Sequence, residues 1–340
     1  MNIREVAKKA RVSTATVSRV INGSAPVSED TAARVRQVIQ QLNFYPNTHA
    51  RTLGSGRSRM YGLIISDITN PFFPELVKSF EDIAVEHGQE VIVANTDYQP
   101  KRMETCVRRM LERKVDGVAI MTSEMEMGLV EMLSLRGIPM VFLDTGVVGP
   151  RCSNIEIDYS GGIDQAIEHL AALGHRRISF ITGPMELKSV RTRYEAFRKS
   201  MERKGIPFSQ ELVRHGNHRI DGGQAAMGQL LQLAERPTAV VASNDLTAIG
   251  AMGTIHEAGL DVPKDISIIG YDDLEISNFT QPPLTTIRVS RSELATRAFT
   301  ALFAASHKGE SQGIAYKIKV NLIIRQTTGI ARTSKKQPKG

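Results

Sequence analysis

The sequence predicts a small all-helical N-terminal unit followed by a larger α/β body of two similar lobes. Three observations carry this prediction. The chain has 340 residues, more than twice a typical domain of about 150 residues. Its first 59 residues hold ten Lys or Arg and three Asp or Glu, a net charge of +7, whereas residues 60–340 hold 33 of each sign. From Tyr61 onward, short β-branched runs alternate with amphipathic helical stripes.

Composition and patterning narrow the class of protein. Apolar residues make up 41% and charged residues 23% of the chain, as in globular proteins rather than disordered ones. The N-terminal residues MNIREVAKKARVS lack the apolar run of a signal peptide, and no run reaches the roughly 18 apolar residues of a membrane span. Cys106 and Cys152 lie far apart and outside any zinc-like spacing. We therefore expect a cytoplasmic protein without a disulfide framework, metal or cofactor.

Three short helices are expected in the basic segment, residues 1–46. Apolar side chains recur at helical spacing at positions 3, 6, 7 and 10, at 17, 20 and 21, and at 35, 38, 39 and 42, where Thr31 lines the same side. Ser13 and Ser28 stand where N-caps of the second and third helices are needed. Asn22-Gly23 ends the second helix, and Asn43 and Pro46 end the third. Such helices can share one small core, and the excess positive charge is typical of a nucleic-acid-binding module.

The second of these helices is the candidate DNA reader. Because its apolar positions face the core, Thr14, Ala15, Ser18 and Arg19 point outward together. In a helix-turn-helix, such residues meet base edges in the major groove, where Arg pairs with guanine and methyl groups contact thymine. Thr16, Ser18 and Asn22 suit phosphates, and Ser13 is placed in the same candidate interface. The alternative is a helical hairpin that merely packs on the body.

The N-terminal segment resembles the head of the LacI/GalR repressor family. The resemblance rests on IREVAKKARVSTATVSRVING and on VSEDTAARVRQVIQQLNFYPNTHARTL, which follow the family pattern over more than 50 residues. One departure is Arg11, where the family often has Gly or Asn between the first two helices. A left-handed backbone at Arg11 would cost about 1 kcal/mol, and the sequence leaves its conformation open.

Residues 47–59 connect this head to the body. NTHARTLGSG is too short to hold a helix alone in water, because helix nucleation is costly. The resemblance implies a hinge helix that folds on DNA, with Leu53 from each of two subunits wedged into the minor groove. Asn47, Ala50 and Leu53 are the candidate contacts. An inert linker is the alternative, against which the apolar pair at positions 50 and 53 argues.

The body, residues 60–330, reads as two half-bodies of βαβ units. The first half contains the expected strands GLIIS, VIVAN, GVAIM and MVFLD, and the second contains ISFIT, AVVAS and ISIIGYDD. Asp144 and Asp272 follow equivalent strands of the two halves. Ligands of parallel α/β sheets lie beyond the carboxyl ends of the strands, so these carboxylates are expected to face a cleft between two lobes. Phe72 and His218 can supply ring faces for a sugar there. For each such residue, a purely structural role such as a helix cap is the alternative.

The family resemblance extends over about residues 1–330, through SDITNPFF, LGHRRISFITGP, SNDLTAIGA, IIGYDD and PPLTTIR. It implies two doubly wound parallel-sheet lobes of the periplasmic-binding-protein type I-like fold. The N-terminal lobe would hold about residues 60–158 plus 288–317, the C-terminal lobe about 159–287 plus 318–330, and 331–340 a disordered tail. Met121 and Val289 stand where some sugar-responsive members carry amides. The expected effector contacts are Phe72, Asp144, Arg193, His218, Asn244 and Asp272.

The expected function is that of a sequence-specific transcriptional regulator, most simply a repressor. We expect a homodimer on a palindromic operator, because one short recognition helix covers few base pairs. A small polar effector would close the cleft, change the order of the hinge and so shift operator affinity. A sugar is the first expectation for this effector, and a sugar phosphate or purine is the second. A solute-binding protein and an enzyme on the same fold are rival classes, but the chain lacks GxSxG, P-loop, HExxH and GxGxxG signatures and neither class explains the basic head.

Overall fold

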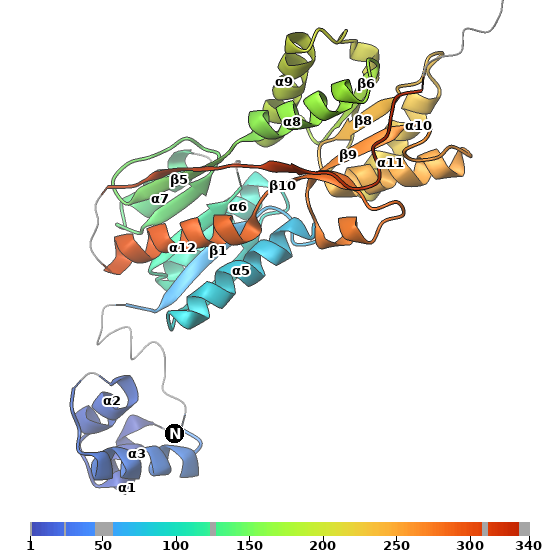
Figure 1. Cartoon of the computed structure of the whole chain (residues 1–340). Coiled ribbons are helices and arrows are strands. Elements are labelled where there is room, and N and C mark those ends of the chain that lie inside the picture. The colour runs from blue at the N-terminus through green and yellow to red at the C-terminus, as the bar shows by residue number, and fades with distance from the viewer. Residues whose placement is uncertain (1, 24, 45–56, 123–126, 308–311, 333–340) are drawn as a thin grey trace, which may run out of the picture. The chain divides into compact units, whose positions relative to one another are not determined.

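The computed structural model describes residues 2–23, 25–44, 57–122, 127–307 and 312–332, in two compact units divided between Arg59 and Met60 (Figure 1). The candidate hinge contacts Asn47, Ala50 and Leu53 lie outside the described residues. Each unit is considered by itself below.

The first unit confirms the three predicted helices, α1 (Ile3–Ala10), α2 (Thr14–Asn22) and α3 (Glu29–Gln41). Its core is formed by the apolar stripes that the sequence predicted, with Val6, Ala10, Val17 and Val35 fully buried and Phe44 closing one end. The guanidinium of Arg34 on α3 donates to the carbonyl of Ala10 at 3.0 Å and ties α3 to the end of α1.

The helix ends explain how the turn of this unit is made. The Ser13 hydroxyl accepts a hydrogen bond from the Thr16 amide at 3.1 Å, so the predicted cap of α2 is present. Arg11 has φ 53° and ψ 48°, which answers the open question: it takes the left-handed conformation and closes α1. The expectation for Ser28 was wrong in one respect. Ser28 precedes α3, but its hydroxyl donates to Thr31 Oγ1 at 2.9 Å and makes no cap bond to the backbone.

The body confirms two parallel-sheet lobes, called here the N-lobe and the C-lobe after the sheet each contains. The N-lobe sheet has the order β11-β5-β4-β3-β1-β2 with all neighbours parallel, and the C-lobe sheet has the order β12-β10-β9-β8-β6-β7 with an antiparallel pair only at β10 and β12. The N-lobe strands are β1 (Met60–Ile65), β2 (Glu90–Asn95), β3 (Gly117–Met121), β4 (Met140–Leu143), β5 (Cys152–Ile157) and β11 (Ala315–Ile318). The C-lobe strands are β6 (Ile178–Thr182), β7 (Val213–His215), β8 (Ala239–Ala242), β9 (Ser267–Asp272), β10 (Thr285–Arg288) and β12 (Asn321–Ile323).

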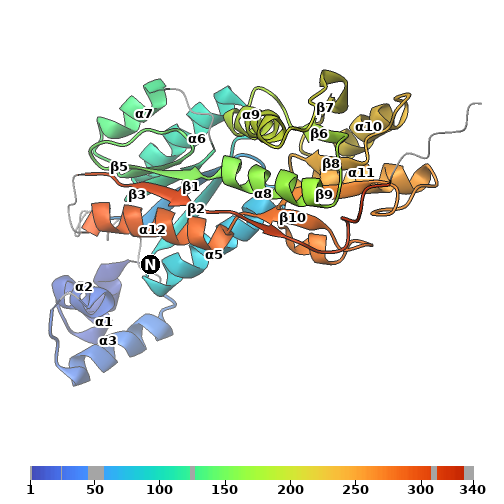
Figure 2. The same ribbon diagram turned by 45° about the horizontal axis from the view of Figure 1, so that its top comes forward.

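Helices pack in pairs on the two faces of each sheet (Figure 2). In the N-lobe the pairs are α5 (Phe72–Glu86) with α12 (Arg291–His307), and α6 (Pro100–Arg113) with α7 (Met127–Ser134). In the C-lobe they are α8 (Tyr159–Ala172) with α9 (Lys188–Arg203), and α10 (Ile220–Leu231) with α11 (Asp245–Glu257). Two short 3₁₀ turns, η1 (Gln210–Leu212) and η2 (Glu275–Asn278), complete the C-lobe. Within the described residues, no helix is long and apolar enough to cross a membrane.

The chain crosses between the lobes three times, from β5 to α8, from β10 to α12 and from β11 to β12. These crossings are tightly packed. A Cβ on Gly162 of α8 would lie 2.6 Å from Val320 and 2.8 Å from Ile287, which flank the second and third crossings. These three segments together form the joint between the lobes.

Candidate functional site

The first candidate site is the outer face of α2. Thr14, Ala15 and Arg19 are exposed together on it, while Val17 between them is fully buried. Thr16 and Ser18 are partly exposed, and the Ser13 and Thr16 hydroxyls also contact each other at 2.9 Å. Asn22 is the last residue of α2, and its side chain lies outside the described part. The face offers one guanidinium, two methyl-bearing side chains and several hydroxyls, which suits the edges and phosphates of a major groove.

The helix that packs on α2 exposes positive charge. Arg4, Lys8, Lys9 and Arg11 on or beside α1 are all exposed. Cations so arranged favour a polyanion whatever its base sequence, since they release counterions from its phosphates. The chemistry of this unit is that of a DNA-binding surface.

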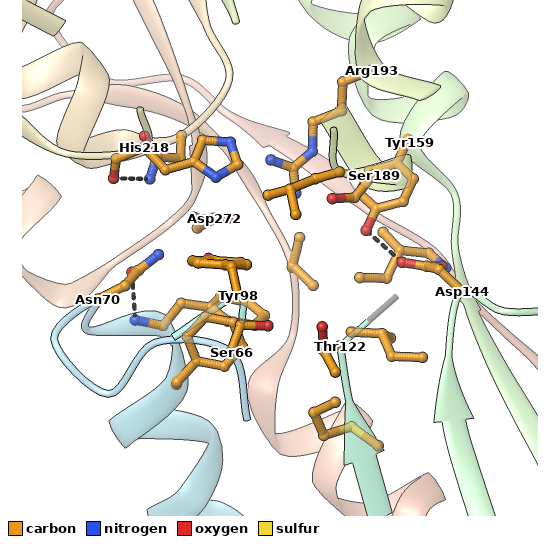
Figure 3. Close-up of a pocket in the computed structure, with 18 residues that line it drawn as sticks. Ser66, Asn70, Tyr98, Thr122, Asp144, Tyr159, Ser189, Arg193, His218 and Asp272 are labelled. Atoms are coloured by element: carbon orange, nitrogen blue, oxygen red, sulfur yellow. Dashed lines mark hydrogen bonds between the residues drawn. The ribbon is translucent and has the colours of Figure 1, made fainter. Parts of the chain in front are cut away.

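The second candidate site is a pocket between the lobes, beyond the carboxyl ends of the strands (Figure 3). Its empty space is about 620 Å³, including the part open to solvent. The structure brings all six predicted effector contacts to this pocket: Phe72, Asp144, Arg193, His218, Asn244 and Asp272. Met121 and Val289 also line it and are almost fully buried, so part of its wall is apolar.

Two hydrogen bonds from nearby residues hold the Asp144 carboxylate in place. It follows β4 with φ 59°, and its carboxylate accepts hydrogen bonds from the Ile157 amide at 2.9 Å and the Tyr159 hydroxyl at 2.5 Å. Burial raises the pKa of Asp144, and these two bonds partly offset that rise. Its backbone carbonyl accepts from Lys188 Nζ at 2.6 Å, across from the N-lobe to the C-lobe.

Asp272, at the end of β9, is the less satisfied of the two carboxylates. It is 5% exposed, and its carboxylate has no hydrogen bond to any residue that the structure describes. Burial raises the pKa of Asp272 to about 7, against the opposing charge of Arg193. The side chain can therefore present either a proton or a lone pair to a ligand near neutral pH.

Arg193 projects from α9 into the same pocket. Its Nη1 donates to the Ser243 carbonyl at 2.6 Å, and its guanidinium lies 4.2 Å from the ring centre of Tyr271 and 4.8 Å from that of Tyr159. Its Nε is buried and has no partner among the described residues. A buried donor without a partner is costly, so Arg193 is poised to bind an acceptor on a ligand.

His218 and Asn244 have different roles. Burial and the charge of Arg193 lower the pKa of His218 to about 3, so its ring is neutral, and its Nε2 is buried without a partner in the described chain. Asn244 caps α11 by accepting from the Thr247 amide at 3.0 Å and donates to the His218 carbonyl at 2.9 Å. The amide of Asn244 thus holds His218, whose φ of 63° is left-handed, in place.

Sequence reasoning missed several pocket residues. Phe73 packs edge-to-face on Phe72 at 5.3 Å and is the next residue of α5. Tyr98 and Thr122 follow β2 and β3, where the rule that ligands lie beyond strand ends would have found them. Tyr159 follows β5, a strand that the sequence analysis did not predict. Figure 3 shows Asn70, Tyr98 and Thr122 facing Arg193 and His218 across the pocket.

The fold and the two sites define a class: a helix-turn-helix DNA-binding unit joined to a two-lobed ligand-binding body. Residues 2–47 match the model of the bacterial regulatory proteins of the lacI family, and residues 167–328 match a periplasmic binding protein-like domain. The chain is 37% identical over 332 residues to the HTH-type transcriptional repressor PurR of Haemophilus influenzae (strain PittEE), covering 96% of this chain and 98% of that protein. The chain belongs to the lacI family of bacterial regulatory proteins.

Solved structures of related proteins agree with this assignment. A crystal structure of the lac repressor dimer bound to operator and the anti-inducer ONPF superimposes with a TM-score of 0.85 at 30% identity, covering 97% of this chain and 99% of that one. The complex of the transcriptional regulator CelR with cellobiose superimposes with a TM-score of 0.73 at 28% identity, covering 96% and 99%. The expected LacI/GalR resemblance and fold are thereby confirmed.

Proposed function

We propose that this protein is a homodimeric transcriptional repressor whose affinity for a palindromic operator is set by a small effector in the interlobe pocket. The observation that carries this proposal is the exposed face of α2, with Arg19 and its methyl-bearing neighbours on a basic unit separate from the ligand-binding body. Similarity over nearly the full length to a repressor named PurR and to a lac repressor dimer on its operator supports it. The domain boundaries and the wedge role of Leu53 given above are part of this proposal.

The charge of the pocket favours a neutral effector. Arg193 brings one positive charge, and Asp144 and Asp272 bring up to two negative charges. Two carboxyl groups beside Arg193 give an anion no net attraction, and this argues against the sugar phosphate among our first alternatives. A neutral ring that accepts from Arg193 and donates to Asp272 satisfies both groups.

Among neutral rings we propose a purine base. Four aromatic side chains line the pocket, Phe72, Phe73, Tyr98 and Tyr159, and flat heterocycles pack well on such rings. Similarity to the repressors named PurR favours the same choice. The sugar that we first expected now stands second. It is favoured by the likeness to CelR, solved with cellobiose, and by the hydroxyl and carboxyl groups of the pocket.

Thermal-shift screening of the full-length protein tests the effector. The panel contains hypoxanthine, guanine and adenine, then ribose, cellobiose and ribose 5-phosphate. A ligand at 100 times its Kd adds about 2.7 kcal/mol to the free energy of unfolding, so a true effector gives a clear shift. Arg193→Met should abolish that shift, whereas Arg198→Met, an exposed residue of the same helix, should not. A shift with sugars alone would replace the purine, and no shift with any compound would refute both.

Selection of duplexes from a fragmented genomic library tests the repressor. Recovery of a two-fold symmetric site, bound at nanomolar concentration and repressing a linked reporter in cells, is the expected result. If no duplex competes better than scrambled DNA, with or without the panel compounds, the protein is not a sequence-specific regulator.

A further inference from the structure

Arg291 stands out among the charged groups around the joint between the lobes. It is the first residue of α12, immediately after the chain has crossed from β10 of the C-lobe, and its side chain is only 15% exposed. It does not line the pocket. It contacts two elements that contribute residues to the pocket, β9 of the C-lobe and α5 of the N-lobe.

On the C-lobe side, Arg291 binds the backbone at the end of β9. Its Nη1 donates to the carbonyl of Asp272, and its Nη2 donates to the carbonyl of Asp273 at 2.8 Å. Asp272 and Asp273 have φ values of 107° and 56°, two successive non-glycine residues in a region that favours glycine. Such backbone persists only where the surroundings hold it. The two bonds from Arg291 help to do so, and they fix the direction in which the Asp272 carboxyl enters the pocket.

On the N-lobe side, Arg291 binds α5. Its Nη2 lies 2.6 Å from the Glu75 carboxylate, and its guanidinium lies 6.0 Å from the ring centre of Phe72. Phe72 begins α5 and forms part of the pocket wall. Glu75 also accepts a hydrogen bond at 3.4 Å from the backbone amide of Glu275, on η2 of the C-lobe. The pair of Arg291 and Glu75 therefore joins the two lobes directly behind the pocket.

We propose that Arg291 is a positioning residue for the effector site: with Glu75 it sets the separation of Phe72 and Asp272 and so couples lobe closure to ligand binding. Only the second part of this proposal, the coupling of lobe closure to ligand binding, rests on the function proposed above. A planar group with five donors can bind two carbonyls and a carboxylate at once, which a lysine ammonium does less well. Asp272 and Asp273 belong to the C-lobe, whereas Glu75 belongs to the N-lobe. The Arg291 guanidinium can therefore bind all three residues only at one interlobe angle.

The first test needs no effector. Spin labels at Lys101→Cys on α6 and Lys199→Cys on α9, both exposed positions, report the distance between the lobes in the full-length protein by pulsed electron resonance. The native Cys106 and Cys152 are buried. A control protein without the two engineered cysteines measures how much spin label these native cysteines take up. We expect a narrow distance distribution in the parent protein, a wider one shifted to longer distances in Arg291→Met and Glu75→Gln, and partial return in Arg291→Lys. Arg297→Met is the matched control, since Arg297 lies on the same helix and pairs with Glu293 on the surface.

The second test measures coupling. The ratio of operator Kd with and without saturating hypoxanthine, or the panel compound that binds, should lie in the range of about 5–150-fold that is usual for allosteric regulators. It should fall close to 1 in Arg291→Met, with the effector itself bound at least about tenfold more weakly, and should be unchanged in Arg297→Met.

Each outcome decides the proposal. Parental distance distributions in Glu75→Gln and in both Arg291 variants overturn it, as does equal widening in Arg297→Met. A lower melting temperature with an unaltered distribution would assign Arg291 a merely structural role. If Arg291→Met fails to fold, the distance distributions of Glu75→Gln and Arg291→Lys still test the proposal. If no panel compound binds while the distributions change as expected, the proposed effector is wrong but the joint is as described.

Discussion

We predict that Asp272 gives binding of the proposed effector a pH dependence that can be worked out from its surroundings. Burial raises its pKa from 3.8 to about 7. Below that pKa the carboxyl is protonated and donates a hydrogen bond; above it the carboxylate accepts. A purine N–H or a sugar hydroxyl that donates to Asp272 is bound more strongly by the charged form, so affinity should fall as the solution is acidified. For a ligand bound by that form alone, Kd rises about 11-fold at pH 6 and about 100-fold at pH 5 relative to its high-pH limit.

Calorimetric titration between pH 5 and 8.5, with the compound identified by the thermal-shift panel, measures this profile. His218, with its pKa near 3, stays neutral throughout and adds no slope. Asp245, whose pKa burial raises to about 6, does not line the pocket. Asp272→Asn should bind more weakly and lose most of the pH dependence, since the slope that remains comes from Asp144, the other pocket carboxyl whose pKa burial raises. The reasoning fails if the parent protein gives a flat profile, or if Asp272→Asn keeps the parental slope.

The same shift makes a stability prediction of definite sign. Since the folded protein holds the Asp272 proton more tightly than the unfolded chain does, the free energy of unfolding falls as pH rises from about 4 through 7. Asp272→Asn removes that contribution. Denaturant unfolding of the two proteins at pH 5 and pH 8 should therefore show a larger fall for the parent.

Four further outcomes are expected. Arg19→Ala should weaken operator binding by about 1 to 3 kcal/mol while sparing random DNA, and equal loss on both in gel-shift titrations would make Arg19 a phosphate contact. Ser13→Ala should lower the stability of the first unit by about 1 kcal/mol in thermal unfolding, as loss of the bond to Thr16 predicts. Gly162→Ala should destabilise the body by about 1 to 3 kcal/mol because its methyl meets Val320 and Ile287, whereas Gly228→Ala, on an open face of α10, should stabilise it by about 0.5 to 1 kcal/mol; similar effects from both would contradict the packing argument. Leu53→Ala should remove most of the operator bend in a circular-permutation assay, and an unchanged bend would refute the wedge.

Periodicity predicted many of the regular elements that bury an apolar stripe, although α12, which buries Leu294, Phe299 and Leu302, was not among them. The helices of the first unit and the strands of Val, Ile and Ala follow directly from the spacing of their apolar residues. Strand β5 escaped because its residues CSNIEI include three polar ones. Two of them are buried with tertiary hydrogen bonds, whereas Glu156 is exposed. Asn154 Oδ1 accepts from the Gly146 amide at 3.0 Å, and Ser153 Oγ accepts from the Ile314 amide at 3.0 Å. No local sequence pattern predicts these hydrogen bonds to residues elsewhere in the chain.

The candidate pocket could be predicted in outline for a different reason. In parallel sheets the position of a ligand follows from strand direction, so Asp144 and Asp272 could be placed without knowing any contact. The sequence could not predict three backbone conformations near the sites. Arg11, His218 and Asp272 have positive φ although none of them is glycine. Each is held by bonds from residues distant in the fold or by its place at a helix end, and these appear only in three dimensions.

The two carboxylates that the sequence presents as equivalents are unequal in the folded protein, and this inequality favours Asp272 as the one that binds the proposed effector. Asp144 accepts from Tyr159 and Ile157 and thereby fixes the start of α8 beside the first crossing between the lobes. Asp272 makes no such bond within the described chain, lies opposite the unpartnered Nε of Arg193 and is held from behind by Arg291. A ligand that satisfies Asp272 and Arg193 at once bridges β9 and α9 on the C-lobe, while its other face meets Phe72 on the N-lobe. Because Arg291 contacts both Asp272 and the Phe72 ring, the group that selects the effector and the group that sets the lobe angle are neighbours. In the function that we propose, effector binding and lobe closure would therefore be coupled through neighbouring groups, as a regulator requires if a small molecule is to change its affinity for DNA.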